Sequence, residues 1–309
     1  MGKWGITGLA LVLIGAALWL AARWVLAHHG VAVLDWADRQ FGGNRGYRVA
    51  VADGHYGPDA AQRIEVIVPA QNSARPLPVI VFIHGGSWNS GDPRDYRFIG
   101  RQLARRGYVV INAGYRLGQP GRFPAMLEDG AAALAWVQRN VTRFGGDPAG
   151  VCLMGHSAGA YNAAMLVLER QWLGRAGLPD GFVRGFIGLS GPYDFYPFTS
   201  DSTRAAFGSQ ADPAITQPIT FVRGDASPML LLTGDRDTTV KPRNSLALGK
   251  ALEQAGGTVQ VVVIEGLDHT ATIKLLAAPF NRDTRVLDPV LHFLSAHCRA
   301  SSPVQPDNR

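Results

Sequence analysis

The sequence has 309 residues, of which 47% are hydrophobic, and a formal net charge of +6. This length suits one large α/β domain or two small ones with a sizeable core. The positive charge comes mostly from scattered arginines, and no basic run is longer than two residues. A nucleic-acid-binding protein concentrates such residues in one patch, so no nucleic-acid partner is expected.

The first predicted element is a membrane anchor. Residues 4–22 carry no charge, and a helix of this length, at about 1.5 Å per residue, comes close to spanning a bilayer core. The apolar region of a cleavable signal peptide has about 7–15 residues, so an uncleaved signal anchor over 1–27 is favoured over a removed signal peptide. With a linker over 28–46, this predicts a membrane-anchored protein whose main domain lies outside the cytoplasm, on the periplasmic side of a bacterial inner membrane.

From residue 47 onward, strand patterns alternate with helix patterns. The expected strands cover 48–52, 62–69, 78–84, 108–112, 151–154, 184–190, 228–233 and 259–264. The expected helices cover 96–106, 124–144, 160–169, 242–255 and 289–297. This alternation predicts an α/β fold with a mostly parallel, eight-stranded sheet, helices on both faces and an antiparallel hairpin at one edge. The domain is expected to cover 47–298, followed by a disordered tail at 299–309.

The two cysteines are Cys152, in the expected strand 151–154, and Cys298, near the C-terminus. We expect them to be a buried small hydrophobic residue and a helix residue rather than a disulfide pair, and no metal-ligand spacing occurs. No metal site is therefore predicted.

The longest irregular stretch, 191–227, contains Tyr193, Phe195, Tyr196, Phe198, Phe207 and Phe221. It is either an ordinary long loop that packs its own aromatic side chains or a small cap over a site. The second interpretation is considered because long loops in α/β domains often cover clefts. Both interpretations remain open.

The residues Gly155-His156-Ser157-Ala158-Gly159 lie between an expected strand and an expected helix. A serine on such a strand-to-helix turn is the arrangement called a nucleophile elbow. The small flanking residues are required because larger side chains would collide with neighbouring backbone. The helix N-terminus adds a partial positive field where negative charge develops during acyl transfer. Ser157 is therefore the candidate nucleophile.

A serine nucleophile needs a base and an orienting carboxylate, expected on loops at the carboxyl ends of strands. Of the eight histidines, His269 follows a strand end on a loop of its own. The loop after 228–233 offers Asp235 and Asp237. Asp237 is preferred because it is further from the strand end and can curl back towards the imidazole, whereas Asp268 is badly placed beside His269. The chain order serine, aspartate, histidine is that of α/β-hydrolases.

Backbone amides are expected to stabilise the oxyanion. One is that of Ala158, directly after the nucleophile, and the others come from the loop His84-Gly85-Gly86-Ser87-Trp88, where glycines allow a close approach of backbone to substrate. Trp88 and His156 are the candidate substrate-binding side chains.

The HGGSW and GHSAG motifs, with Asp237 and His269, resemble the α/β-hydrolase esterases of the HGG type, including BD-FAE-like carboxylesterases, over roughly 53–296. The resemblance implies ester hydrolysis without a cofactor, with Ser157, Asp237 and His269 as the triad. It also implies an oxyanion hole formed by the amides of Gly85, Gly86 and Ala158. The chain departs from the HGGG pattern at Ser87.

The expected substrates are therefore small-molecule esters with small to medium acyl or aryl groups. The HGG-x-Trp pattern is also similar to kynurenine formamidases, so formamide hydrolysis by the same triad is the alternative, although those enzymes are generally soluble. A catalytically silent, anchored binding protein is a third hypothesis, with a missing triad member as its hallmark. The sequence leaves the oligomeric state and the natural substrate open.

Overall fold

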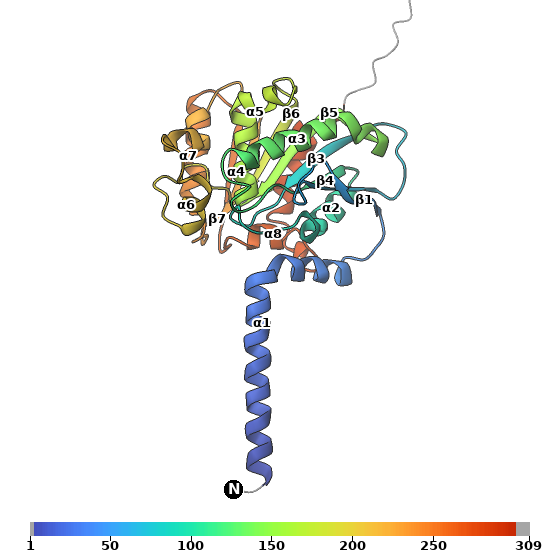
Figure 1. Ribbon diagram of the computed structural model, residues 1–309. Coiled ribbons are helices and arrows are strands. Elements are labelled where there is room, and N and C mark those ends of the chain that lie inside the picture. The colour runs from blue at the N-terminus through green and yellow to red at the C-terminus, as the bar shows by residue number, and fades with distance from the viewer. Residues whose placement is uncertain (1–2, 301–309) are drawn as a thin grey trace, which may run out of the picture.

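A computed structural model describes residues 3–300 of the chain, apart from many side chains in the first part of the N-terminal helix (Figure 1). The predicted disordered tail, 299–309, therefore lies almost wholly outside the described residues.

One eight-stranded sheet forms the centre of the described chain, as predicted. Its strands are β1 (Tyr47–His55), β2 (Arg63–Pro69), β3 (Leu77–Ile83), β4 (Val109–Ala113), β5 (Gly146–His156), β6 (Val183–Leu189), β7 (Met229–Gly234) and β8 (Val259–Ile264). They lie in the order β1-β2-β4-β3-β5-β6-β7-β8. The pairs β1–β2 and β2–β4 are antiparallel, and all other pairs are parallel. The antiparallel edge and the parallel body of the sheet are thus confirmed.

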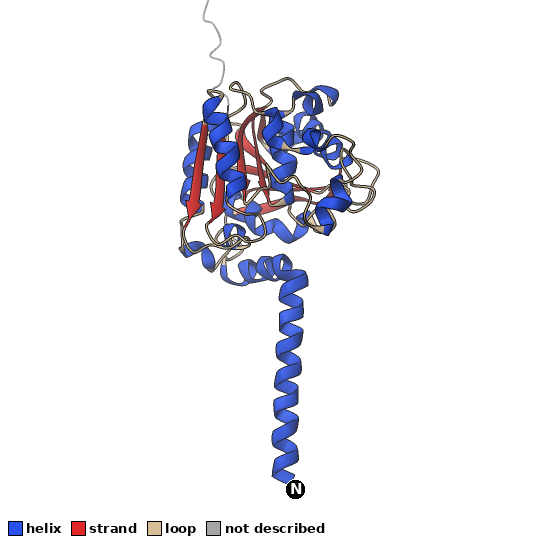
Figure 2. Ribbon diagram, turned by 90° about the vertical axis from the view of Figure 1, so that its left-hand side faces the viewer, coloured by secondary structure: helices blue, strands red, loops and turns tan. Residues whose placement is uncertain are grey.

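Helices cover both faces of this sheet (Figure 2). They are α2 (Arg97–Ala104), α3 (Ala125–Asn140), α4 (Ala158–Leu168), α5 (Arg170–Arg175), α6 (Asp201–Phe207), α7 (Arg243–Gln254), α8 (Ala271–Lys274) and α9 (Leu287–His297). Together with the sheet they confirm the α/β fold with helices on both faces that the alternating pattern predicted.

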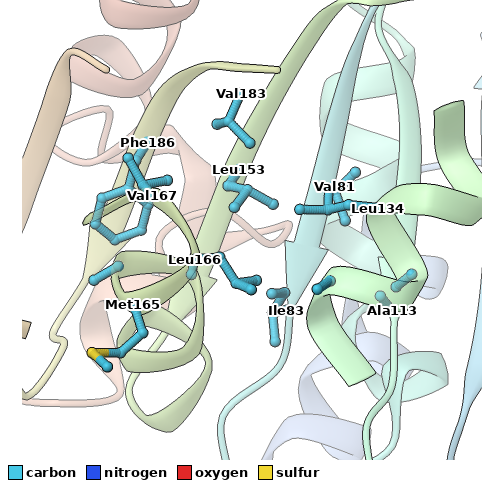
Figure 3. Close-up of a cluster of buried hydrophobic side chains, with 14 of the residues drawn as sticks. Val81, Ile83, Ala113, Leu134, Leu153, Met165, Leu166, Val167, Val183 and Phe186 are labelled. Carbon is cyan, nitrogen blue, oxygen red and sulfur yellow. The ribbon is translucent and has the colours of Figure 1, made fainter. Parts of the chain in front are cut away.

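Successive residues of the buried strands point to opposite faces of the sheet, because side chains alternate along a strand. Val81, Ile83 and Leu153 pack with residues of α3 and α4 in one core cluster (Figure 3). Phe82 and Met154 pack with residues of α2 and α9 in a second cluster. The continuous apolar runs of the sequence therefore reflect strands that are buried on both faces.

The N-terminal helix, α1 (Lys3–Phe41), consists of two arms that meet at a kink, where His29 has non-helical angles of φ −130° and ψ 24°. The first arm projects away from the domain, and the second lies beneath it (Figure 1). Arg101 of α2 fixes the second arm, since its guanidinium donates to Asp35 and to Asp38 at 2.7 Å each. The Asp38 carboxylate also accepts from the backbone amide of Ala278 at 2.8 Å.

In the part of the chain whose side chains the structure describes, no helix is long and apolar enough to cross a membrane. The predicted anchor, 4–22, falls in the first arm of α1, where most side chains lie outside that description.

The expectation that the two cysteines are unpaired is wrong. Cys152 and Cys298 form a disulfide across 146 residues of sequence, with their Cα atoms 5.9 Å apart. Cys152 points to the face of the sheet that α9 covers, and Cys298 directly follows the last residue of α9. The packing of α9 therefore brings together two residues that the sequence alone gave no reason to pair.

The stretch 191–227 packs its own aromatic side chains and also contacts the rest of the domain. It contains α6 and two 3₁₀ helices, Pro213–Thr216 and Pro218–Phe221. The ring of Phe207 lies 4.8 Å from that of Trp88 and 5.1 Å from that of Tyr161 on α4, and Phe195 lies 5.3 Å from Phe207. This aromatic cluster of Trp88, Tyr161, Phe195 and Phe207 joins the irregular stretch to the loop after β3.

Candidate active site

Ser157 lies between the end of β5 and the start of α4, in the sharp turn that the sequence predicted. Its φ of 53° and ψ of −122° are sparsely populated by residues with a side chain, and such strain concentrates at functional sites. A Cβ at Gly155 would lie 2.5 Å from the carbonyl carbon of Gly159, and a Cβ at Gly159 would overlap the carbonyl oxygen of Ile83. Both flanking positions therefore require glycine.

The structure brings Ser157, His269 and Asp237 together from the carboxyl ends of β5, β8 and β7. The Ser157 hydroxyl lies 2.9 Å from Nε2 of His269, and Nδ1 of His269 lies 2.8 Å from Oδ2 of Asp237. A carboxylate only accepts hydrogen bonds, so Nδ1 carries the proton and Nε2 is left to accept from the serine hydroxyl. This is the tautomer in which the imidazole can act as a general base.

Asp237 is held as a carboxylate by its surroundings. Its side chain is fully buried, and Oδ1 accepts from the amides of Thr239 at 3.0 Å and Val240 at 2.8 Å. Burial acts to raise the pKa of this carboxyl, but the hydrogen bond and charge of His269 and the Val240 amide outweigh it. The pKa of Asp237 therefore lies below the ordinary 3.8.

The other two candidate carboxylates are engaged elsewhere. Asp235 accepts from the backbone amide of Gly266 at 2.6 Å, in the turn that follows β8. Asp268 accepts from the amides of Thr270 and Ala271 at the start of α8. Neither carboxylate replaces Asp237 beside the imidazole.

The loop after β3 lies against the nucleophile. A Cβ at Gly85 would lie 3.2 Å from Cβ of Ser157, and Gly86 has a φ of 120°. Ser87, where the HGGG pattern has its third glycine, keeps a left-handed φ of 54° despite its side chain. The loop is anchored by His84, whose ring stacks on that of Tyr115 at 4.6 Å and whose carbonyl oxygen accepts from the Tyr115 hydroxyl at 3.2 Å. The backbone of Gly85 and Gly86 is thus held beside Ser157, as is the amide of Ala158 that follows it.

Trp88 and His156, predicted to contact substrate, are both buried. The Trp88 indole donates to Oδ1 of Asn162 at 3.1 Å and belongs to the aromatic cluster. Nε2 of His156 lies 3.2 Å from the backbone carbonyl oxygen of His269. Both side chains therefore contact the framework of the site, and a direct role in substrate binding stays a prediction.

Sequence reasoning missed a pocket that adjoins the candidate oxyanion loop. A pocket of about 780 Å³ adjoins Gly85 and Gly86 on one side and Thr270, the residue after His269, on another, and residues 29–34 and 37 of α1 line it as well. No local pattern marks these α1 residues, because the kink at His29 and the docking of the second arm bring them to the site. Among the described residues, no group of three or more His, Cys, Asp or Glu could hold a metal ion.

The fold and the arrangement around Ser157 are those of an α/β-hydrolase. The BD-FAE family model matches residues 64–252, more than half of the chain, and the chain belongs to this family.

Proteins similar in sequence include two enzymes named as esterases and one named as a formamidase. The isoprenylcysteine alpha-carbonyl methylesterase of Arabidopsis thaliana is 28% identical over 236 residues, which cover 70% of this chain and 55% of that protein. Esterase LipC of Mycobacterium tuberculosis is 31% identical over 60% of this chain and 50% of its own length. The kynurenine formamidase of Danio rerio is 26% identical over 72% of this chain and 75% of its own length. The chain spans about half the length of the first two relatives.

Solved structures share the fold. Esterase B from Lactobacillus Rhamnosis superimposes with a TM-score of 0.71 at 22% identity, over 93% of both chains. A truncated carbohydrate esterase from gut microbiota superimposes with a TM-score of 0.70 at 19% identity, over 80% of this chain and 98% of its own. At these identities the likeness supports the α/β-hydrolase fold alone.

Proposed function

We propose that this protein hydrolyses carboxylic esters of small to medium acyl or aryl substrates, with Ser157 as nucleophile, His269 as general base and Asp237 as the carboxylate that orients it. The observation that carries the proposal is the continuous hydrogen-bonded chain from the Ser157 hydroxyl through both imidazole nitrogens to the buried Asp237. Relatives named as esterases support it.

In the proposed reaction, the Ser157 oxygen attacks the ester carbonyl carbon while Nε2 of His269 takes the hydroxyl proton. The amides of Gly85, Gly86 and Ala158 donate hydrogen bonds to the developing oxyanion. The C–O bond to the alcohol then breaks, and His269 returns the proton to the leaving alcohol. Water, deprotonated by His269, hydrolyses the acyl-enzyme and releases the acid and the free serine.

The test is the Ser157→Ala variant, assayed on p-nitrophenyl butyrate and labelled with a fluorophosphonate. We expect hydrolysis to fall to the buffer level and labelling to disappear, while circular dichroism stays unchanged. Retained hydrolysis or labelling in the variant would contradict the assignment. Absence of both from the wild-type protein would instead favour the third hypothesis, a catalytically silent binding protein.

Formamide hydrolysis is a second candidate, because the kynurenine formamidase of Danio rerio matches 72% of this chain. The same triad could attack a formamide carbon, with an amine as the leaving group. Rates on N-formylkynurenine and on p-nitrophenyl butyrate separate the two functions. A higher kcat/KM for the formamide would replace the ester proposal.

We also propose that the protein is membrane-anchored through residues 4–22, with its hydrolase domain outside the cytoplasm. Two observations support this: the uncharged apolar run itself and the Cys152–Cys298 disulfide, since disulfides persist in oxidising compartments. Fractionation of cells that express the full chain, with protease added from the outer side of the membrane, tests both parts. A domain found in the cytosolic fraction, or protected from the protease, would contradict the proposal.

A further inference from the structure

The pocket that adjoins Gly85 and Gly86 lies between the loop after β3, α8 and the second arm of α1. The carboxyl ends of the parallel strands point towards α1 (Figure 2). The label of α8 lies just above the second arm of α1 in Figure 1. The pocket's volume of about 780 Å³ is within the range of clefts that bind small organic ligands. Its lining combines the apolar α1 wall with the backbone of Gly85 and Gly86 and with residues of α8.

The α1 wall of this pocket is apolar. It is formed mainly by Val31, Ala32, Val33, Leu34 and Ala37, all of which are only partly buried in the described chain. These side chains thus keep apolar surface that a ligand in the pocket would remove from water. Burial of such surface is the main favourable contribution to binding an apolar chain.

The same wall is held in place before any ligand arrives. Val31 and Leu34 pack against the second core cluster of the domain. Arg101 ties Asp35 and Asp38, on the same arm, to α2. A binding surface that is already ordered loses less conformational entropy when a ligand binds.

The aromatic cluster that contains Trp88, on the same loop as Gly85 and Gly86, offers no comparable space. Trp88, Tyr161, Phe195 and Phe207 pack ring against ring, with centroid distances between 4.8 and 6.2 Å. Space for an apolar group beside this loop is therefore found in the pocket that α1 lines.

From these observations we propose that the second arm of α1 binds the apolar chain of the substrate, so that the protein prefers esters with a medium-length alkyl chain over acetates. This inference rests on the proposed esterase function. Each methylene group that the α1 wall buries in the transition state is expected to raise kcat/KM about fourfold, equal to about 0.8 kcal/mol.

The test places a large side chain in the pocket from the α1 side. Ala37→Trp is compared with Gln40→Trp, which adds the same side chain at an exposed position of the same arm. The full chain is assayed in non-ionic detergent on p-nitrophenyl acetate and octanoate. We expect Ala37→Trp to lower the octanoate-to-acetate ratio of kcat/KM roughly tenfold or more, which corresponds to the loss of about two buried methylenes. Gln40→Trp should keep both the wild-type ratio and the wild-type rate on acetate.

An unchanged ratio in a folded Ala37→Trp variant would overturn the inference, and so would an equal loss with Gln40→Trp.

If Ala37→Trp does not fold, Val33→Ser tests the inference instead, because it keeps a small side chain and makes the α1 wall more polar. The octanoate-to-acetate ratio of kcat/KM should then fall by several-fold. Ser157→Ala separates the two levels of the proposal. Hydrolysis that persists in Ser157→Ala would contradict the proposed function. Hydrolysis that depends on Ser157, together with an unchanged octanoate-to-acetate ratio in the α1 variants, would contradict only the role of α1.

Discussion

Nε2 of His156 donates a hydrogen bond of 3.2 Å to the backbone carbonyl oxygen of His269. The carbonyl oxygen can only accept, so the proton lies on Nε2 of His156. Burial lowers the pKa of His156 to about 3, and the ring is therefore neutral near pH 7. The residue that precedes the nucleophile thus connects the elbow directly to the loop that carries the candidate base.

This contact predicts that His156 positions His269. His156→Phe keeps a ring of similar shape but removes the donor, and we expect kcat to fall about tenfold with little change in KM, because misplacing a catalytic group costs rate rather than binding. His156→Gln restores a donor and should recover part of the loss. Steady-state kinetics on p-nitrophenyl butyrate checks this, and wild-type kcat in the Phe variant would show that the contact has no role in positioning.

Two buried histidines predict that acid destabilises the fold. Burial lowers the pKa of His84 to about 4 and that of His156 to about 3, from the ordinary 6.5. Between pH 6.5 and 4 the unfolded chain binds these two protons and the folded chain does not, so the free energy of unfolding falls as the pH falls. The slope should be up to roughly 1.4 kcal/mol per pH unit for each histidine. Urea denaturation at pH 7.5, 5.5 and 4.5 measures it, and His156→Gln should reduce the slope. A free energy of unfolding that does not change over this range would contradict the prediction.

The two carboxylates after β7 form a matched pair for mutation. Asp237→Asn removes the acceptor that fixes the imidazole tautomer, and a loss of about 10⁴-fold in kcat is expected from the equivalent change in serine proteases. Asp235→Asn alters only the contact with the Gly266 amide, so its effect should stay below about tenfold. Comparable losses in both variants would mean that Asp237 has no special role.

The Cys152–Cys298 disulfide predicts a redox-dependent stability. Cys298→Ser opens a loop of 146 residues, and the free energy of unfolding should fall by about 2–5 kcal/mol. Ester hydrolysis per folded molecule should not change, because the cross-link lies on the α9 face of the sheet. Denaturation curves with and without reductant measure the effect. A reductant should shift the wild-type curve and leave that of Cys298→Ser in place; identical shifts in both would mean that the cross-link does not contribute.

Much of the fold could be predicted because its signals are local. Apolar runs marked the strands, and the predicted ranges overlap all eight strands of the sheet, although β5 begins at Gly146 rather than at residue 151. The early part of β5 is irregular, since its register with β3 shifts between Leu77 and Val79. Such a shift depends on the neighbouring strand and leaves no pattern in the sequence.

The nucleophile elbow was determined by the sequence itself, because a turn this sharp excludes a Cβ at Gly155 and Gly159 and so leaves a signature in adjacent residues. The order of Ser157, Asp237 and His269 followed from the rule that loops at the carboxyl ends of parallel strands meet. The sequence favoured Asp237 over Asp235, and the tertiary structure places Asp237 beside the imidazole. Only the tertiary structure could pair Cys152 with Cys298 and bring the second arm of α1 to the edge of the site. Each of these depends on how separate elements pack against one another, which no local pattern of residues encodes.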